Sequence, residues 1–456
     1  MRSTKNPNAV GYLPNETPSP GKLLVFSLQQ FITMFPATVL AALLMGFHTS
    51  TALFASGVAT IATQLVTKFF SKDKTAIPLY YGSSFSFIAA VAALTGVKAF
   101  GEVAPDALIG QAQFGIIMAG VASALAGLLV ARVGMAKIEK VLPPSVTGSV
   151  ALIVGGSLFV VALNNASGYD AATGLTSNIA WIAALITLLS TVLFSVFLKG
   201  VWQQSSILLG IGVGFLASIP MGLVDFSRVA ASNFITTPHF TAPVPSIAAL
   251  LAIMPIAIAT IPESTAHLFQ IDLYVDKLAE EKQSRRKYNI KNKLWLNLVA
   301  DGIGDIVAAL FGGPAGTNYG ENIAVKAISK VFSNATVIGA ALLAIASSFI
   351  GPVNAFVNSI PAAVINGACI YLFGVIAVQG VALMIEKKVN IFDGRNAAVI
   401  AVVLVVGLGG SYAFAGNGMI PFFGAELPAI ATAAIAGIVL NLILNIGRKE
   451  APENVE

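Results

Sequence analysis

Residues 141–198 read VLPPSVTGSVALIVGGSLFVVALNNASGYDAATGLTSNIAWIAALITLLSTVLFSVFL, and Asp170 is the only charged residue among them. One membrane crossing takes about 20 predominantly apolar residues, so this stretch is long enough to cross a bilayer more than once. The whole chain has the same character, since 56% of its 456 residues are hydrophobic, only 10% are charged and the mean hydropathy is +0.83. A soluble domain carries roughly 25% charged residues. The sequence therefore predicts an all-α polytopic membrane protein.

Composition excludes several other classes of protein. The single cysteine, Cys369, rules out a disulfide framework and a cysteine-rich metal site. The three histidines, His48, His239 and His267, are too few for a histidine-based zinc centre, so neither a metal site nor a cofactor is expected. The basic residues form short runs between apolar spans rather than a stripe with interleaved aromatic residues, so nucleic acid is not expected as a partner.

Loops divide the apolar sequence into about fourteen transmembrane segments. We place these spans near 23–47, 50–67, 78–97, 108–131, 144–163, 178–198, 202–222, 246–270, 294–312, 314–333, 335–352, 361–385, 395–412 and 426–446. With a cytoplasmic N-terminus, the outer loops receive only Lys98 and Arg228 of the 26 basic residues, as the positive-inside rule requires. We therefore expect a multi-pass protein of the cytoplasmic membrane, surrounded by lipid, with both termini in the cytoplasm.

A basic loop at 276–293 divides the chain into halves of seven spans, 23–222 and 246–446. Because seven is odd, the second half crosses the membrane in the opposite sense, which is the signature of an inverted repeat. Spans 3 and 10 are then symmetry partners. Residues 77–85 read IPLYYGSSF and residues 312–322 read GGPAGTNYGEN, so both contain Pro and a Tyr-Gly pair.

These two breaks in the apolar pattern favour an extended lead-in followed by a half-helix, whose free N–H groups face the bilayer midplane. Paired breaks in corresponding segments point to the substrate site of a transporter. Ordinary kinks without function are the alternative interpretation.

Glu263 lies deep in span 8, and His267 follows one helical turn later on the same face. A charged side chain at this depth costs about 2.5–3.5 kcal/mol on insertion scales, so it normally faces a cavity and has a function. We interpret Glu263 as a proton carrier with His267 beside it. A structural hydrogen bond to a neighbouring helix is the alternative for Glu263, and helix packing is the alternative for His267.

Further positions in spans 9 and 10 carry charge. Glu321 stands at the N-terminus of the predicted half-helix, where it can accept N–H bonds from a planar heterocycle; a helix cap facing a loop is the alternative. Asp301 and Asp305, four residues apart, fit either a solvent-accessible or capping role or a role in coupling. Lys326 is expected to extend toward water.

The sequence contains no HExxH, GxSxG or Walker motif, so it offers no identifiable catalytic nucleophile and we do not expect an enzyme. A channel would favour continuous pore-lining helices with rings of charge rather than one paired break with two lone carboxylates. Transport is therefore the predicted class of function.

Five motifs resemble the nucleobase–ascorbate transporter family, most closely its bacterial uracil-permease branch. They are Ser27-Leu-Gln-Gln30, Phe35-x-Ala37-Thr38-Val39, Gly82-Ser-Ser-Phe85-x-Phe87-Ile88, Pro262-Glu263-x3-His267-Leu268 and Gly312-Gly-Pro-x-x-Thr317-x-Tyr319-Gly-Glu-Asn322. The resemblance covers nearly the whole chain from about Lys22 onward. It implies two inverted seven-span repeats with short strands in spans 3 and 10, and a homodimer.

The resemblance also implies a division into two domains. Residues 23–140 (spans 1–4) and 246–352 (spans 8–11) would form a core domain. Residues 141–245 (spans 5–7) and 353–447 (spans 12–14) would form a gate domain, through which the homodimer assembles. Cytoplasmic tails would lie at 1–22 and 448–456.

By position, Glu263 and Glu321 match the two substrate-binding glutamates of the family. Phe85, Tyr319 and Gly320 match residues that line the base. Proton-coupled import of uracil is the function that the resemblance implies. A carboxylate at Glu321, where purine-transporting relatives usually place glutamine, suits the ring N–H donors of uracil. A purine (xanthine-type) symporter and an uncoupled nucleobase facilitator are the alternatives, and sodium is the alternative coupling ion.

His267 matches a histidine near the coupling glutamate. A second group of candidate residues surrounds these positions: Gln30, Ser84, Asn322, Asp301, Asp305 and Phe373. Two of them depart from the branch, which commonly has histidine at Gln30 and tyrosine at Phe373. Ala324 and Ser329 also differ from the family pattern, which prefers Gly and Thr there.

Overall fold

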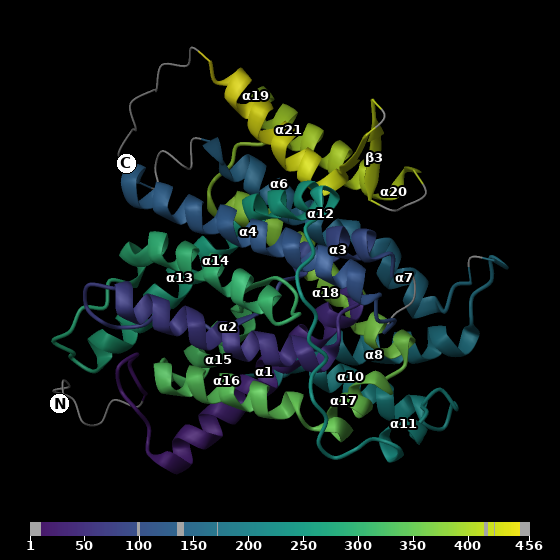
Figure 1. The fold of residues 1–456 in the computed structure, drawn as a ribbon. Coiled ribbons are helices and arrows are strands. Elements are labelled where there is room, and N and C mark those ends of the chain that lie inside the picture. The colour runs from purple at the N-terminus through teal and green to yellow at the C-terminus, as the bar shows by residue number, and fades with distance from the viewer. Residues whose placement is uncertain are drawn as a thin grey trace.

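The computed structural model describes residues 11–97, 101–134, 141–170, 172–414, 418–423 and 425–446 (Figure 1). In the first half, the elements are α1 (Pro20–Met45), α2 (Thr49–Phe70), β1 (Tyr81–Ser83), η1 (Phe85–Phe87), α3 (Ile88–Thr95), α4 (Asp106–Val133), α6 (Pro144–Ser157), α7 (Phe159–Ser167), α8 (Asn178–Phe197), α9 (Val201–Gln204), α10 (Ser206–Ser218) and α11 (Ser227–Ala230).

The second half begins with α12 (Ile247–Ile253), η2 (Met254–Ile256), α13 (Ala257–Glu281), η3 (Ile290–Lys293), α14 (Leu294–Leu310), β2 (Gly316–Asn318), α15 (Gly320–Ser329) and α16 (Asn334–Ser348). It continues with α17 (Gly351–Asn358), α18 (Ala362–Glu386), α19 (Gly394–Leu404), the π-helical turn η4 (Val405–Gly409), α20 (Gly410–Tyr412), β3 (Met419–Phe422), β4 (Ala425–Pro428) and α21 (Ala429–Leu444).

The described chain is predominantly helical, and its helices have the length and composition of membrane spans. Eight helices are long and apolar enough to cross a bilayer, and four shorter apolar helices lie over Phe85–Thr95, Ser206–Ser218, Asn334–Ser348 and Ala429–Leu444. Apolar side chains also cover outer faces: Leu189, Leu193 and Phe197 follow one face of α8 at four-residue intervals and are exposed. A face of this kind is stable against lipid rather than water. The prediction of a polytopic membrane protein is confirmed.

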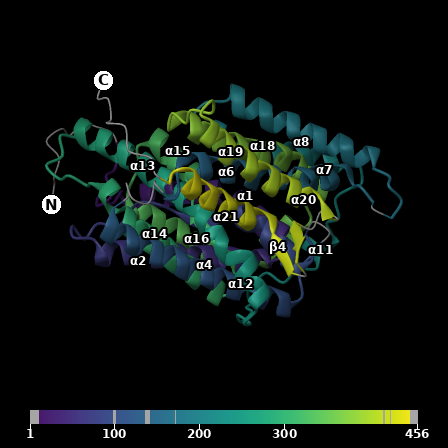
Figure 2. The same cartoon turned by 90° about the horizontal axis from the view of Figure 1, so that it is seen from above.

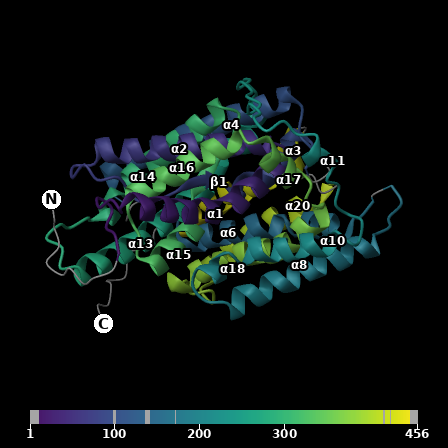
Figure 3. The same cartoon turned by 90° about the horizontal axis from the view of Figure 1, so that it is seen from below.

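Two groups of helices lie side by side in views from opposite directions (Figures 2 and 3). One group contains α2, α4, α14 and α16, with α4 packed on α14 and α2 packed on α16. The other contains α8, α10 and α18, and α18 packs on both α6 and α8. The broken spans 3 and 10 and the helices α1 and α13 lie between these layers, so their breaks face the space between the groups.

The short strands expected in spans 3 and 10 are both present. β1 and β2 pair antiparallel, with Tyr81 opposite Asn318, Gly82 opposite Thr317 and Ser83 opposite Gly316. Each strand leads into a half-helix, which is η1 followed by α3 in the first case and α15 in the second. The pairing satisfies backbone groups that the bilayer interior could not.

Side chains of α2 hold the extended lead-in to β1. Gln64 Nε2 donates to the carbonyl oxygens of Ile77 (2.6 Å) and Leu79 (3.0 Å). Thr60 Oγ1 accepts from the backbone N–H of Tyr81 at 3.1 Å. Thr60 and Gln64 are four residues apart and therefore share a helix face. The polar face of α2, on an otherwise apolar helix, therefore holds the lead-in to β1 in an extended conformation.

The structure differs from the predicted boundaries at two helices. α13 continues to Glu281, so the basic loop begins later than residue 276. α21 begins at Ala429 rather than 426, because the paired strands β3 and β4 occupy the residues before it. The predicted tail 448–456 and the side chains of Lys98 and Arg228 lie outside the described residues.

The described part of the predicted N-terminal tail is docked on the second half of the chain. Tyr12 forms a parallel bridge with Val331, and Leu13 is fully buried. Lys282 Nζ forms an ion pair with Glu16 at 2.6 Å. This contact joins the start of α1 to the end of α13.

Candidate functional site

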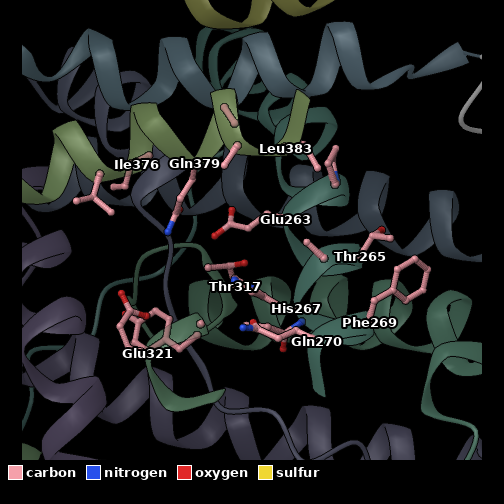
Figure 4. A pocket seen from close by; sticks show the side chains of 18 of the residues that line it. Glu263, Thr265, His267, Phe269, Gln270, Thr317, Glu321, Ile376, Gln379 and Leu383 are labelled. Atoms are coloured by element: carbon pink, nitrogen blue, oxygen red, sulfur yellow. The ribbon is translucent and has the colours of Figure 1, made fainter. Parts of the chain in front are cut away.

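A cavity of about 1180 Å³ lies between the two groups of helices (Figure 4). Its wall comes from α13, from the starts of η1 and α15, and from α6 and α18 on the opposite side. The cavity extends to Lys291, Glu386 and Lys387, which are exposed residues at the ends of η3 and α18. It therefore opens on the side of the molecule where α13 and α18 end.

All of the principal residues predicted from the sequence line this one cavity. They are Phe85, Glu263, His267, Tyr319, Gly320 and Glu321. Figure 4 shows the two carboxylates at the same cavity, Glu263 from α13 and Glu321 from the first turn of α15. The fold thus brings together segments that lie far apart in the sequence.

Glu263 faces the start of the first half-helix. Ser86 Oγ, in η1, donates to Glu263 Oε2 at 3.4 Å. Pro262 precedes the carboxylate within α13 and has no N–H to give to the helix, which leaves a backbone carbonyl one turn earlier without its usual partner. Glu263 consequently follows a helix position that lacks one backbone hydrogen bond, and its carboxylate accepts from a hydroxyl.

Glu321 is the second residue of the other half-helix. Tyr319 takes the N-cap position in an extended conformation, without a side-chain cap. The first N–H groups of α15 have no partner within the helix, and the positive end of the helix dipole points toward Glu321. This end of the cavity therefore combines backbone donors with a carboxylate acceptor.

His267 packs closely against the backbone of Gly320. A Cβ atom at Gly320 would lie 2.9 Å from His267 Nε2, so only glycine allows the imidazole to approach the start of α15. The ring also lies close to the backbone of Asn318. Its Nδ1 atom is buried and has no hydrogen-bond partner among the described residues. His267 is thus placed next to both the carboxylate-bearing helix and the second strand.

Tyr319 is fixed by its hydroxyl group. That hydroxyl donates to the carbonyl oxygen of Ser83 at 3.0 Å and lies 3.0 Å from Thr38 Oγ1. The Tyr319 ring crosses over Gly82, where a Cβ atom would come within 2.4 Å of the ring. Because the hydroxyl is held by protein groups, the ring is the part of Tyr319 available to a planar ligand.

The second group of candidate residues lies behind the cavity wall. Gln30, Ser84, Asn322, Asp301, Asp305 and Phe373 are all buried, and none of these described residues lines the cavity. Asn322 Nδ2 donates to both the backbone oxygen and Oε1 of Gln30 at 2.9 Å, which ties α15 to α1. Ser84 Oγ accepts from the N–H of Ser86. Phe373 packs in the core of α18 with no exposed surface.

Asp301 and Asp305 are buried and hold the paired strands, so the interpretation that they are solvent-accessible is wrong. Asp305 Oδ1 accepts from the hydroxyl of Tyr81 at 2.6 Å and from the N–H of Gly316 at 2.8 Å. Asp301 Oδ1 accepts from Asn318 Nδ2 at 3.0 Å. Asp305 thus binds both β1 and β2, and Asp301 orients the end of β2.

Replacing Asp305 with alanine is expected to destabilise the protein. The change leaves the Tyr81 hydroxyl and the Gly316 N–H buried without an acceptor, and each such group costs about 1–3 kcal/mol. A matched control is Asp170→Ala, since Asp170 is exposed and its carboxylate accepts hydrogen bonds from Ala172 and Thr173 of its own loop. Thermal unfolding in detergent should show a lower Tm for Asp305→Ala than for the control. Equal Tm values would contradict this role.

Lys326 is not directed toward water, and this expectation is wrong. Its side chain is 0% exposed, and its Nζ atom donates to the carbonyl oxygen of Pro78 at 2.9 Å. The sequence shows a lysine on a short amphipathic helix. It does not show that the lead-in to β1 passes over that helix and accepts the ammonium group.

Sequence reasoning also missed polar residues of the cavity wall. Ser86, Thr317 and Gln379 all line the cavity. Figure 4 shows Gln379 extending from α18 toward Glu263, across the space between the helix groups. A signal was present in the sequence, because a polar amide within the predominantly apolar span 361–385 is costly in a membrane and tends to face a polar cavity or another helix.

These features together define a membrane transporter, because polar groups converge on a cavity at two broken spans of a predominantly helical, apolar fold. The model of a family described as the permease family matches residues 21–416. The chain belongs to this family, the nucleobase–ascorbate transporters. It is accordingly a transport protein and not an enzyme.

Curated relatives match nearly the whole chain. It is 34% identical to the uracil permease of Bacillus caldolyticus over 447 residues, covering 96% of each chain. The uracil permease of Bacillus subtilis (strain 168) is also 34% identical, with 97% of each chain covered. A putative pyrimidine permease of Escherichia coli (strain K12) is 31% identical over 98% of this chain and 94% of its own.

Solved structures with the same fold include other transporters. The transmembrane domain of a cyanobacterial bicarbonate transporter superposes with a TM-score of 0.61 at 15% identity, covering 94% of this chain and all of that one. The murine Solute Carrier 26 family member A9 anion transporter, in an inward-facing state, gives a TM-score of 0.64 at 11% identity, covering 95% of this chain and 69% of its own. At these identities the likeness concerns the fold.

Proposed function

We propose that the protein imports uracil together with protons across the cytoplasmic membrane. The observation that carries this proposal is the convergence of Glu263 and Glu321 on one cavity beside the starts of two half-helices. Relatives named uracil permease match the chain over nearly its full length, which supports uracil as the substrate.

Uracil presents two ring N–H donors and two carbonyl acceptors in one plane, and the cavity offers a complement to each. The carboxylate of Glu321 accepts ring N–H groups. Backbone N–H groups at Phe85 and Gly320, the first residues of η1 and α15, serve the carbonyls. The rings of Phe85 and Tyr319 supply apolar faces for the base. His267 and Gly320 keep this end of α15 in place.

The proton site in this proposal is Glu263. Uracil is neutral near pH 7, so its accumulation needs a second, charged species that moves down its own gradient. A carboxylate that lines a cavity opening to water on one side can exchange a proton there. Ser86 donates to the same carboxylate, and His267 is one turn away on the same helix. Sodium is the alternative coupling ion.

An inverted seven-span repeat is part of the proposal, and the helix packing supports it. The contact of α4 with α14 in spans 4 and 9 has its counterpart in the contact of α16 with α2 in spans 11 and 2. The contact of α8 with α18 corresponds to that of α19 with α6, and the contact of α3 with α12 corresponds to that of α15 with α1. Fourteen spans related by a two-fold axis would generate such matched pairs.

The same packing supports the core and gate domains. We propose a core of residues 23–140 and 246–352, a gate of 141–245 and 353–447, and a homodimer formed through the gate. The cavity runs between core and gate, where substrate release requires a change of contact. With both termini in the cytoplasm, the cavity mouth at Lys291 and Lys387 faces the cytoplasm, so the described state is open inward.

Radiolabelled uracil uptake into proteoliposomes tests this function. Under an imposed inward proton gradient we expect uracil to accumulate above its equilibrium concentration, because each imported base is accompanied by a proton. A protonophore should abolish the accumulation. Unlabelled uracil should compete with the label and unlabelled xanthine should not.

The other outcomes assign the alternatives. Competition by xanthine at equal concentration would favour a purine symporter. Uptake that only reaches equilibrium, and that a protonophore leaves unchanged, would favour an uncoupled facilitator. Accumulation that requires a sodium gradient would overturn proton coupling.

A further inference from the structure

Two of the three histidines and an aspartate come together at the end of the molecule away from the cavity mouth. His48 precedes α2, Asp106 is the first residue of α4, and His239 lies in the extended segment between α11 and α12, visible in Figure 1. One potential ligand atom from each residue lies within 4.8 Å of the other two. His239 Nε2 is 3.0 Å from Asp106 Oδ2, and the two imidazole centroids are 4.5 Å apart.

The segments that carry these three side chains are tied together by hydrogen bonds. The N–H of Ala104, just before α4, donates to the carbonyl oxygen of Gly46 at 2.9 Å. Thr51 Oγ1, in the first turn of α2, donates to the carbonyl oxygen of His239 at 2.7 Å. The cluster therefore lies on a prebuilt scaffold rather than on three independent loops, which lowers the cost of ordering ligands around an ion.

We propose that His48, Asp106 and His239 form a binding site for one divalent transition-metal ion, and that Zn²⁺ is the ion that fits best. Imidazole nitrogen and carboxylate oxygen are both common zinc ligands, and a site with three protein ligands leaves a fourth tetrahedral position for water. The side chains of His239 and Asp106 are half exposed or more, so water has access to that position. Sequence composition excluded a zinc centre by counting histidines, and it did not consider a carboxylate as the third ligand.

The arrangement of the three side chains suits a metal ion. Imidazole nitrogen in its neutral form and carboxylate oxygen are the atoms that such an ion binds, and they face one another here. Asp106 supplies negative charge beside the two facing imidazoles. A divalent cation between the three groups satisfies both rings and the carboxylate at once.

The test uses the full chain, purified with any histidine tag removed, stripped with EDTA and mixed with Zn²⁺. We expect about one zinc ion per chain by elemental analysis and a higher Tm in the presence of zinc, because a ligand that binds the folded state stabilises it. Each of His48→Ala, Asp106→Asn and His239→Ala should weaken zinc binding by at least about tenfold, since even loss of an outer partner of a metal ligand costs about 10–100-fold in affinity.

Asp170→Asn is the matched control, because Asp170 is also an exposed aspartate in a predicted outer loop. Its zinc affinity should equal that of the unchanged protein. Co²⁺ serves as a spectroscopic probe, and its visible absorption should show four-coordinate geometry that is lost in the His48→Ala His239→Ala double variant. Tm values without metal establish that each variant is folded. Absence of zinc binding in the unchanged protein, or equal binding by the folded variants, overturns the proposal.

Discussion

Replacing Glu321 with alanine is expected to abolish measurable binding of uracil. Glu321 is the carboxylate at the start of α15, where it accepts ring N–H groups in the proposed complex. Hydrogen bonds to a charged group contribute about 1.5–3 kcal/mol each, so their loss should weaken binding by roughly 100-fold. Ligand-induced thermal shift in detergent measures the effect. The uracil-dependent rise in Tm should disappear, while the Tm without ligand should change little.

Two further variants make this test specific. Glu386→Ala removes a carboxylate from the exposed end of α18, at the mouth of the same cavity, and should keep the thermal shift. Glu321→Gln keeps one acceptor but places an amide N–H₂ where the second acceptor stood, so uracil affinity should be intermediate. Unchanged uracil affinity in Glu321→Ala would refute the proposed role of this carboxylate.

Replacing Glu263 with glutamine is expected to remove proton-driven accumulation and to leave exchange of uracil intact. Glutamine matches glutamate in shape and can still accept from Ser86, but it neither takes up nor releases a proton near neutral pH. The accumulation ratio under an inward proton gradient should fall to about one, the value for uncoupled movement. Two measurements on the same proteoliposomes separate the effects: uptake driven by the gradient, and counterflow between equal uracil concentrations at equal pH.

The pH dependence of the same variant provides an independent check. In the unchanged protein, lowering the external pH increases the inward proton gradient and should increase uptake. The glutamine variant should show no such increase, because the proposed proton site has been removed. Glu386→Gln is the control and should retain the dependence. Gradient-driven uptake that persists in Glu263→Gln would place the proton elsewhere.

Most of the architecture could be predicted from the sequence because the bilayer imposes a simple rule on the chain. Spans must be apolar and about 20 residues long, so hydropathy locates them. The elements of the structure fall within a few residues of the predicted spans, with the extension of α13 to Glu281 as the main exception. That helix carries charged residues in its last turns and continues past the apolar stretch, which hydropathy cannot detect.

Glu263 and Glu321 could be proposed as site residues for the same reason. A lone carboxylate in an apolar span is a local signal that needs no knowledge of its neighbours. The roles of Asp301 and Asp305 could not be found in this way, because their partners Asn318, Tyr81 and Gly316 lie on strands that are distant in sequence or pair only after folding.

The sequence also did not show in which direction a side chain points or which distant residues lie close to it. Lys326 was expected to reach water, but Pro78 crosses above it and accepts its ammonium group. Phe373 belonged to the second group of candidate residues, yet it is fully buried in the core. A shift of a few residues along α18 decides which side chains reach the cavity. His48, Asp106 and His239 lie on three separate segments, and their approach depends on tertiary packing alone.

The pairing of β1 with β2 has a consequence for how the protein is made. During synthesis, Tyr81–Ser83 reach the membrane long before Gly316–Asn318, so the backbone groups of β1 that pair with β2 have no strand partner at that stage. Hydrocarbon offers no substitute donors or acceptors. The first half of the chain consequently cannot complete its fold when it is inserted, because β2 has not yet been synthesised. The transporter can therefore complete its fold only after both halves have been synthesised and the two short strands have paired.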